Sequence, residues 1–166
     1  NGVKLLVPCG TTGESVTMSA EERIHVIEMT VEVAKRHKGA KVSAGSGSNN
    51  TAATIDFTRK VREIGADMAL VVGPYYNKPT QDGYFAHFKE IANSVKKFPI
   101  MLYNVPGRTA SSINAATQVR IAEEFPNIVA TKEASGDLSQ IMEIVNRRPK
   151  NFRVFSGDDA LTVPML

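Results

Sequence analysis

A lysine follows a short apolar run in the segment "NIVATKEASGD", residues 127–137. The run 128–131 is typical of a buried strand, and Lys132 then places an ammonium group where burial makes a charge costly. A lysine enclosed in a cavity loses its proton more readily, and the free amine attacks a ketone to form a Schiff base. The alternative is a lysine at a strand end that extends its ammonium into water. The unusually polar residues around Lys132 favour the enclosed amine.

A phenol and a guanidinium lie close together in "LYNVPGRT". Pro106 and Gly107 predict a sharp turn, so that Tyr103 and Arg108 can face one cavity. An arginine there suits bidentate binding of a substrate carboxylate. A core tyrosine with its hydroxyl at the rim and a solvated arginine are the alternatives.

Two hydroxyl groups lie between glycines in "CGTTGES". Gly10 and Gly13 allow a ligand to approach the backbone closely and leave N–H groups free to bind an anion. Thr11 and Thr12 can instead cap a helix. A capping box that begins at Ser19 already serves the next helix, which favours a ligand-binding role for the two threonines.

Adjacent tyrosines, Tyr75 and Tyr76, lie on a loop bounded by prolines. Neighbours in sequence must point in different directions if both are buried in their own chain. One of the two rings can therefore leave the subunit and contact a partner.

The histidines and the cysteine predict no metal site. His25, His37 and His87 show no ligand spacing with one another or with Cys9, and we expect them at the surface or at helix caps. A single cysteine excludes an internal disulfide framework and fits a reducing cytosol.

The elements that must position these groups alternate along the chain. Short apolar runs predict strands at 3–7, 41–44, 68–72, 100–103, 128–131 and 152–155. Helical stripes lie between them at Ile24, Ile27, Val31 and Ala34, at Phe57, Val61 and Ile64, at Phe85, Phe88, Ala92 and Val95, and at Leu138, Ile141 and Val145. Continuous hydrophobicity in the strands indicates cover on both faces, and hence a parallel sheet with helical crossovers.

Two α/β architectures fit this alternation, an open doubly wound sheet and a TIM (β/α)₈ barrel. The nearest dinucleotide-binding motif, "GSGSNN", has Asn50 in the third glycine position, and no Walker A motif exists. Polar, glycine-rich loops after every strand instead suit the mouth of a barrel. We expect residues 1–166 to form one partial barrel domain of six strand–helix units, with the first and last units absent, because a barrel needs eight strands and about 250 residues.

Composition excludes several other classes of protein. With 42% hydrophobic and 22% charged residues among 166, the chain has the make-up of one globular domain. The net charge is +3 and the basic residues are scattered, which argues against nucleic-acid binding. The sequence has neither a membrane-length apolar run nor a secretory leader, and a cytoplasmic location is expected.

Five motifs, in order along the whole chain, resemble the dihydrodipicolinate synthase family of pyruvate-dependent enzymes. They are "GTTGES", "GPYYNKPTQDGYFAHF", "YNVPGRT", "TKEASGD" and "SGDD". Single motifs are shared with the wider class I aldolase superfamily, including N-acetylneuraminate lyase and 2-keto-3-deoxygluconate aldolase. The resemblance implies a lyase that condenses pyruvate with aspartate 4-semialdehyde to 4-hydroxy-tetrahydrodipicolinate, in lysine and diaminopimelate biosynthesis.

The resemblance also implies the catalytic groups. Lys132 would form the Schiff base with pyruvate, so that no cofactor is needed. Thr11, Tyr103 and Tyr76 would relay protons, with Tyr76 reaching into the site of a neighbouring subunit. The protein would therefore be a homo-oligomer, a dimer or a tetramer.

Substrate-binding residues are implied in the same way. Thr12 would hold the carboxylate of pyruvate, and Arg108 would bind that of aspartate semialdehyde. Gly157 and Asp158 would line the floor of the cavity. "YNVPGRT" favours the synthase over the sugar-acid aldolases, which remain the alternative, together with a barrel remnant that has no catalytic activity.

Regulation by lysine is expected to be weak. Inhibited members of the family carry two histidines and a glutamate where this chain has Ala20, Arg23 and Ala53, although Ser15, Asn49 and Tyr75 match.

Overall fold

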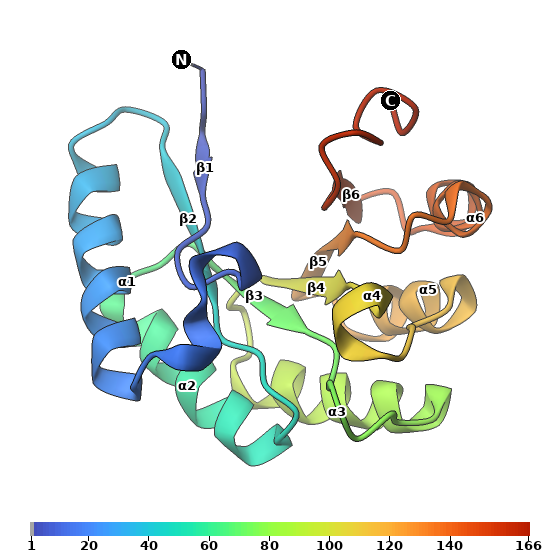
Figure 1. Cartoon of the computed structure of the whole chain (residues 1–166), viewed down its shortest axis with the longest axis horizontal. Coiled ribbons are helices and arrows are strands. Elements are labelled where there is room, and N and C mark those ends of the chain that lie inside the picture. Colours follow the sequence, from blue (N-terminus) through green and yellow to red (C-terminus); the bar gives the residue numbers. More distant parts are fainter. Residues whose placement is uncertain (1) are drawn as a thin grey trace.

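Six parallel strands form one curved sheet in the computed structural model, which describes residues 2–166. The strands are β1 (Leu5–Leu6), β2 (Lys41–Gly45), β3 (Met68–Val72), β4 (Ile100–Asn104), β5 (Ile128–Glu133) and β6 (Arg153–Ser156), and they lie in sequence order. Figure 1 shows them along an arc, with the long helices outside it and both termini on its open side. The arrangement is an open part of a (β/α)₈ barrel, called the half-barrel below, with six of the eight strands, which confirms the predicted fold class.

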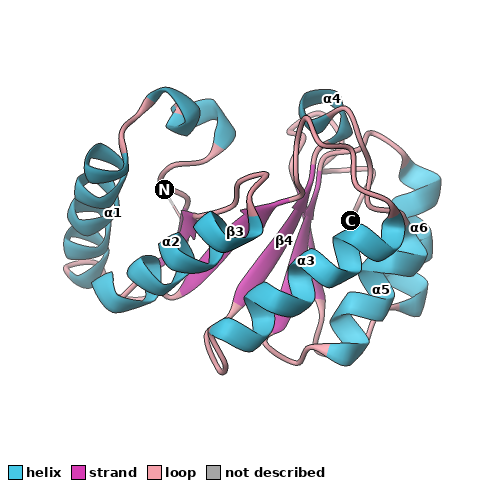
Figure 2. Ribbon diagram, turned by 90° about the horizontal axis from the view of Figure 1, so that it is seen from below, coloured by secondary structure: helices cyan, strands magenta, loops and turns pink. Residues whose placement is uncertain are grey.

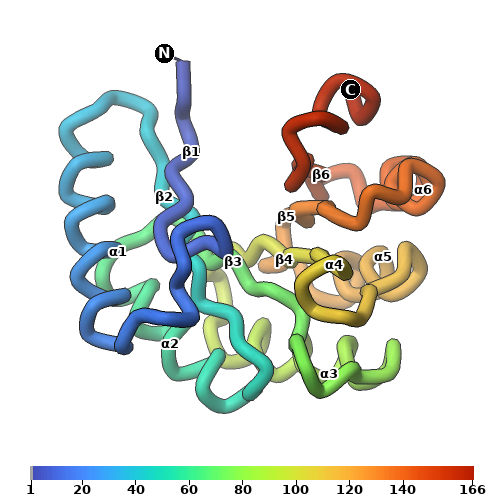
Figure 3. Tube along the Cα trace, in the orientation of Figure 1, coloured from blue at the N-terminus to red at the C-terminus, as the bar shows by residue number. Residues whose placement is uncertain are grey.

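The long helices follow the strands in turn. They are α1 (Ala20–Lys35), α2 (Thr51–Ile64), α3 (Gln81–Ser94), α5 (Ala115–Glu124) and α6 (Leu138–Arg147). Figure 2 shows α2 and α3 in front of the strands, and the trace in Figure 3 passes from β1 around the arc to β6. The capping box of α1 is confirmed, because Ser19 N–H donates to Glu22 Oε2 (2.8 Å) and Glu22 N–H donates to Ser19 Oγ (3.2 Å). Among the described helices, none is long and apolar enough to cross a membrane.

Three short helices lie on the loops after β1 and β4, at the carboxyl ends of the strands. They are η1 (Thr11–Gly13), η2 (Ser15–Thr17) and α4 (Pro106–Thr109). Pro106 is accommodated at the first turn of α4, where a helical N–H has no partner. These turns carry three of the predicted site residues to the end of the half-barrel where the loops meet.

Strand β4 is buried on both faces, as the uninterrupted apolar run predicted. Ile100 and Leu102 pack in the cluster between the sheet and the helices. Met101 and Tyr103 belong to a second cluster on the concave face of the sheet. Because side chains alternate along a strand, the residue types of β4 decide which groups face the inside of the arc.

The predicted apolar stripe of α6 is only partly correct. Ile141 and Ile144 are buried, whereas Leu138 and Val145 are 38% and 41% exposed. Leu138 and Val145 lie on a neighbouring face of the helix. Ile141 and Ile144, three residues apart, pack inward. The strand predicted at 3–7 is also shorter, because only Leu5–Leu6 pairs with β2.

His87 is buried, so the expectation that it lies at the surface or caps a helix is wrong. It lies on α3 and is 5% exposed, with Nδ1 2.9 Å from Thr51 Oγ1 on α2. The helical period of 3.6 residues could have indicated this burial, because Tyr84 and Ile91 lie on the same face of α3 and both are buried. Burial lowers the pKa of His87 to about 4.

This buried histidine predicts a loss of stability in acid. Between about pH 6.5 and 4, His87 binds a proton in the unfolded chain but not in the folded chain. The free energy of unfolding therefore falls as the pH falls. We expect His87→Leu to flatten this dependence in urea unfolding measured across that range. The matched control is the exposed His25→Leu, and equal slopes in the two variants would contradict the prediction.

Candidate functional site

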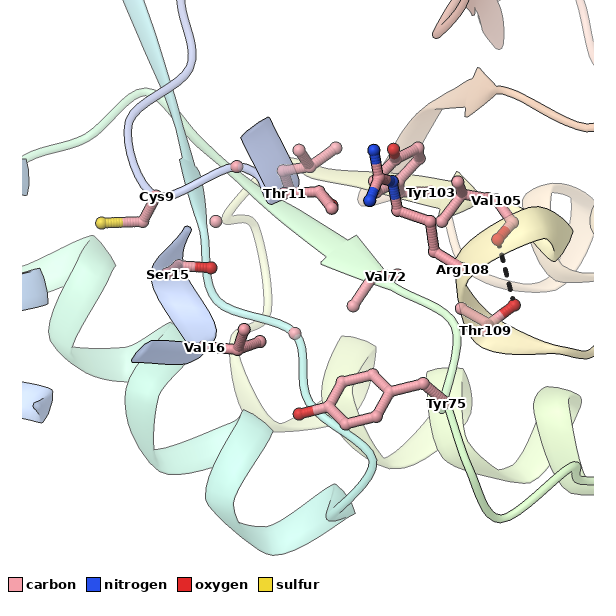
Figure 4. Close-up of a pocket in the computed structure, with 14 residues that line it drawn as sticks. Cys9, Thr11, Ser15, Val16, Val72, Tyr75, Tyr103, Val105, Arg108 and Thr109 are labelled. Carbon is pink, nitrogen blue, oxygen red and sulfur yellow. Dashed lines mark hydrogen bonds between the residues drawn. The ribbon is translucent and has the colours of Figure 1, made fainter. Parts of the chain in front are cut away.

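The concave side of the half-barrel holds a cavity of about 390 Å³ at the carboxyl ends of the strands. Thr11, Tyr103 and Arg108 line it, each from a different segment of the chain. Figure 4 shows these three side chains around one space, with Tyr75 on the opposite side. The structure therefore brings together three of the eight site residues that the sequence indicated.

Lys132 lies within β5, directly opposite Tyr103 of β4 in the parallel ladder. The strand continues to Glu133, two residues beyond its predicted end. The Nζ atom of Lys132 is 4.5 Å from the centroid of the Tyr103 ring. Tyr103 thus connects the amine to the cavity, because its ring faces Lys132 and it also lines the cavity wall.

The amine of Lys132 is partly withdrawn from water. Its burial lowers the pKa of the ammonium below the ordinary lysine value, and the carboxylate of Asp159 opposes this effect. A larger fraction of the amine is therefore free and nucleophilic than in an exposed lysine. The sequence indicated Asp158 for this region, whereas the charge that acts on Lys132 belongs to its neighbour.

Gly157 lies against the side chain of Lys132. A Cβ atom at this position would be 3.2 Å from Lys132 Cε and 2.7 Å from Ala134 Cβ. Any larger residue would have to displace the lysine or the β5 backbone, so the glycine leaves room for the amine. Asp158 is exposed, and its Oδ1 accepts the N–H of Ala160 (2.9 Å) within its own loop.

Thr12 and Tyr76 do not line the cavity. Thr12 is exposed on η1, next to Thr11. Tyr76 is 88% exposed and adopts a left-handed backbone conformation with φ of 69°. Its neighbour Tyr75 lines the cavity instead, and the contact of one of these rings with a partner subunit stays a prediction.

Arg23 is held by contacts within its own chain. Its Nη2 donates to the carbonyl of Gly45 (3.1 Å), and its guanidinium stacks 4.0 Å above the ring of Phe57. The arginine therefore ties α1 to β2 and α2. Weak inhibition by lysine, which the sequence indicated partly through Arg23, stays a prediction.

Chemically, the site combines a nucleophilic amine with a phenol, a hydroxyl and a guanidinium. The phenol and hydroxyl can carry protons, and the guanidinium can bind a carboxylate. Residues 2–166 contain no group of three or more histidine, cysteine, aspartate or glutamate side chains placed to hold a metal ion. The arrangement suits covalent chemistry on a keto acid.

Known proteins resemble this chain over its whole length. The model of the dihydrodipicolinate synthetase family matches residues 1–166. The chain is 53% identical to the 4-hydroxy-tetrahydrodipicolinate synthase of Koribacter versatilis, with 100% of the chain and 54% of the relative covered. It is 51% identical to that of Bacillus subtilis, with 100% and 56% covered.

A solved structure agrees with the sequence comparisons. The crystal structure of dihydrodipicolinate synthase from Aquifex aeolicus superimposes with a TM-score of 0.94 at 48% identity. The match covers 99% of this chain and 55% of that protein. The chain thus spans about half the length of the relatives that it matches.

The half-buried amine predicts a particular dependence of stability on pH. Below the lowered pKa of Lys132, burial of its ammonium costs the folded state stability, and this cost disappears as the pH rises toward the ordinary lysine value of about 10.4. The difference in free energy of unfolding between Lys132→Met and the wild type should therefore fall as the pH rises. Denaturant unfolding at a series of pH values above 7 measures this difference. The control is the exposed Lys89→Met, and a difference that stays constant for Lys132→Met would contradict the prediction.

Proposed function

Because the chain belongs to the dihydrodipicolinate synthetase family, we propose that it condenses pyruvate with aspartate 4-semialdehyde through a Schiff base on Lys132. The observation that carries this proposal is the half-buried amine of Lys132, 4.5 Å from the ring of a tyrosine that lines the cavity. A nucleophilic lysine beside a proton-carrying phenol is the minimum that such a reaction requires. The product would be 4-hydroxy-tetrahydrodipicolinate.

In the first step, the free amine of Lys132 attacks the keto carbon of pyruvate and water leaves. The resulting iminium withdraws electrons from the neighbouring methyl carbon, which then loses a proton and becomes a nucleophilic enamine. The enamine carbon attacks the aldehyde of the second substrate, and the amino group of that substrate then attacks the imine carbon. This closes the ring and breaks the bond to Lys132, which leaves as the free amine. No cofactor is needed, because the protonated imine is itself the electron sink.

Tyr103 and Thr11 are the proposed proton carriers in these steps. Both line the cavity, and the Tyr103 ring contacts the amine on which the imine forms. Proton transfer is needed when water leaves, when the enamine forms and when the new hydroxyl is made. Gly157 would keep the space that the lysine and its adduct occupy.

Two positively polarised groups would hold the substrate carboxylates. Arg108, on the turn of α4, lines the cavity and would bind the carboxylate of the semialdehyde. Thr12 and the backbone between Gly10 and Gly13 would bind that of pyruvate.

Assembly with further subunits is part of the proposal. Tyr76 is 88% exposed, so its ring is accessible to the surface of a neighbouring subunit. We propose that it enters the site of a neighbouring copy and extends the proton relay there. The protein would then act as a homo-oligomer.

Reduction with borohydride in the presence of pyruvate tests the Schiff base. We expect a pyruvyl adduct on Lys132, located by peptide mass mapping, because hydride reduces the imine to a stable amine. Lys132→Met should give no adduct, while the exposed Lys89→Met should label as the wild type does. Labelling elsewhere, or none on protein shown to be folded by circular dichroism, would contradict the proposed chemistry.

The role of Arg108 separates the two substrates. Arg108→Ala should lower kcat/KM for aspartate semialdehyde by about 10- to 100-fold. A decrease of this size corresponds to the loss of one or two charge-assisted hydrogen bonds. Pyruvate trapping on Lys132 should persist. Arg108→Lys, which keeps the charge without the planar fork, should lie between Ala and the wild type.

The outcome also distinguishes the neighbouring enzyme class. Preferential turnover of polyhydroxylated sugar acids, or an equal loss of trapping and turnover in Arg108→Ala, would contradict the synthase assignment.

A further inference from the structure

Glu133 is a buried carboxylate next to the proposed nucleophile. It follows Lys132 on β5 and is 1% exposed. Within the described part of the chain, it forms no ion pair with a lysine, arginine or histidine. Burying a carboxylate without a cation is costly. A protein with an apolar residue of similar volume at such a position is often at least as stable.

Neutral donors surround both oxygens of Glu133. Oε1 accepts from Asn104 Nδ2 (2.8 Å) and Gln118 Nε2 (2.5 Å), and more weakly from Gln140 Nε2 (3.3 Å). Oε2 accepts from the hydroxyl of Ser135 (2.6 Å). Both oxygens of the buried side chain therefore have hydrogen-bond donors. The donors come from β4, α5, α6 and the loop after β5.

The partners of Glu133 are themselves fixed. Asn104 Oδ1 accepts the backbone N–H of Ile113 (3.0 Å), and Gln118 Nε2 also donates to the carbonyl of Ile113 (2.8 Å). Gln118 Oε1 accepts the hydroxyl of Thr131 (2.8 Å). Each amide group is therefore held at both its oxygen and its nitrogen, and the network has little freedom to rotate.

The network lies directly behind the reacting pair. Asn104 faces Glu133 in the β4–β5 ladder, one position after Tyr103 faces Lys132. Since side chains alternate along strands, the polar pair points to the helix layer and the reacting pair points to the concave face. A hydrogen bond between Asn104 and Glu133 thus fixes the two strand ends from which Tyr103 and Lys132 project.

We propose that Glu133 is a positioning residue for Lys132: its carboxylate, bound by Asn104, aligns the ends of β4 and β5 so that the amine faces the ring of Tyr103. The consequence for catalysis rests on the proposed function, but the placement of the amine can be measured without substrate. The cost of burying the carboxylate is then explained, because an apolar residue would stabilise the fold without fixing this alignment.

Three groups surround the amine that Glu133 positions. The phenol of Tyr103 faces it from β4, Gly157 contacts its stem, and the carboxylate of Asp159 acts on it from the segment after β6. If β4 and β5 lose their alignment, the amine moves into water or closer to Asp159. Both changes raise the pKa of Lys132 toward its ordinary value.

Two variants break the tie between the strands. Asn104→Asp keeps the acceptor for Ile113 but removes the donor to Glu133 and sets two carboxylates together. Glu133→Leu keeps the volume and removes the acceptor that Asn104 and Gln118 share, so that their amide nitrogens keep only the bonds to Ser112 and Ile113. Glu133→Gln is the conservative variant, because its carbonyl oxygen can still accept from both amides.

The experiment follows the acetylation of Lys132 by acetic anhydride as a function of pH, with peptide mass mapping. We expect the labelling midpoint to rise in Asn104→Asp and Glu133→Leu, and Glu133→Gln to recover most of the shift. Pyruvate trapping should slow by about tenfold or more in the first two variants, since small displacements of a reacting group are costly. Ile144→Ala, which leaves a cavity under α6, is the control for lost stability and should not move the midpoint.

The outcomes separate this proposal from the proposed function. Unchanged midpoints in Asn104→Asp and Glu133→Leu, with lower melting temperatures as in Ile144→Ala, would show a purely structural role and overturn the proposal. A shift in Glu133→Gln as large as in Glu133→Leu would overturn the hydrogen-bond argument. If the midpoints shift as expected but the wild type traps no pyruvate, the proposed function fails and the positioning role stands.

Discussion

The pairing of β4 with β5 sets the Lys132 amine against the ring of Tyr103, and the rest of the site depends on that contact. A charged amine half removed from water is unfavourable, so burial lowers the pKa of Lys132. The Tyr103 ring provides an aromatic face, and Gly157 leaves the space beside the lysine stem. Sequence order around the half-barrel then brings Thr11 and Arg108 to the same cavity.

Much of the fold was predictable because it depends on local patterns. Six runs of apolar residues separated by helical stripes specify a parallel sheet with crossovers, whatever the side chains at the loops. The predictions that were wrong concern the burial of single side chains, which tertiary packing determines. His87 is buried because α3 turns that face toward α2, and Leu138 is exposed because Ile141 and Ile144 already occupy the inner face of α6.

The site was predictable in part. Residue types and the family resemblance indicated Lys132, Tyr103, Thr11 and Arg108, and the structure places the last three around one cavity with Lys132 against Tyr103. The importance of Asp159 and Glu133 was not predictable, because their effects depend on distances between segments far apart in the sequence. The sequence does not distinguish a buried glutamate from an exposed one, because its neutral hydrogen-bond partners are identified only in the structure.

The state of the Lys132 amine is the central claim, and ¹³C NMR of labelled lysine tests it directly. The Cε resonance of Lys132, assigned by its absence in Lys132→Met, reports protonation of the adjacent nitrogen. This resonance is expected to titrate at lower pH than those of the exposed lysines, because burial lowers the pKa of Lys132. Titration together with the exposed lysines, or above them, would contradict it.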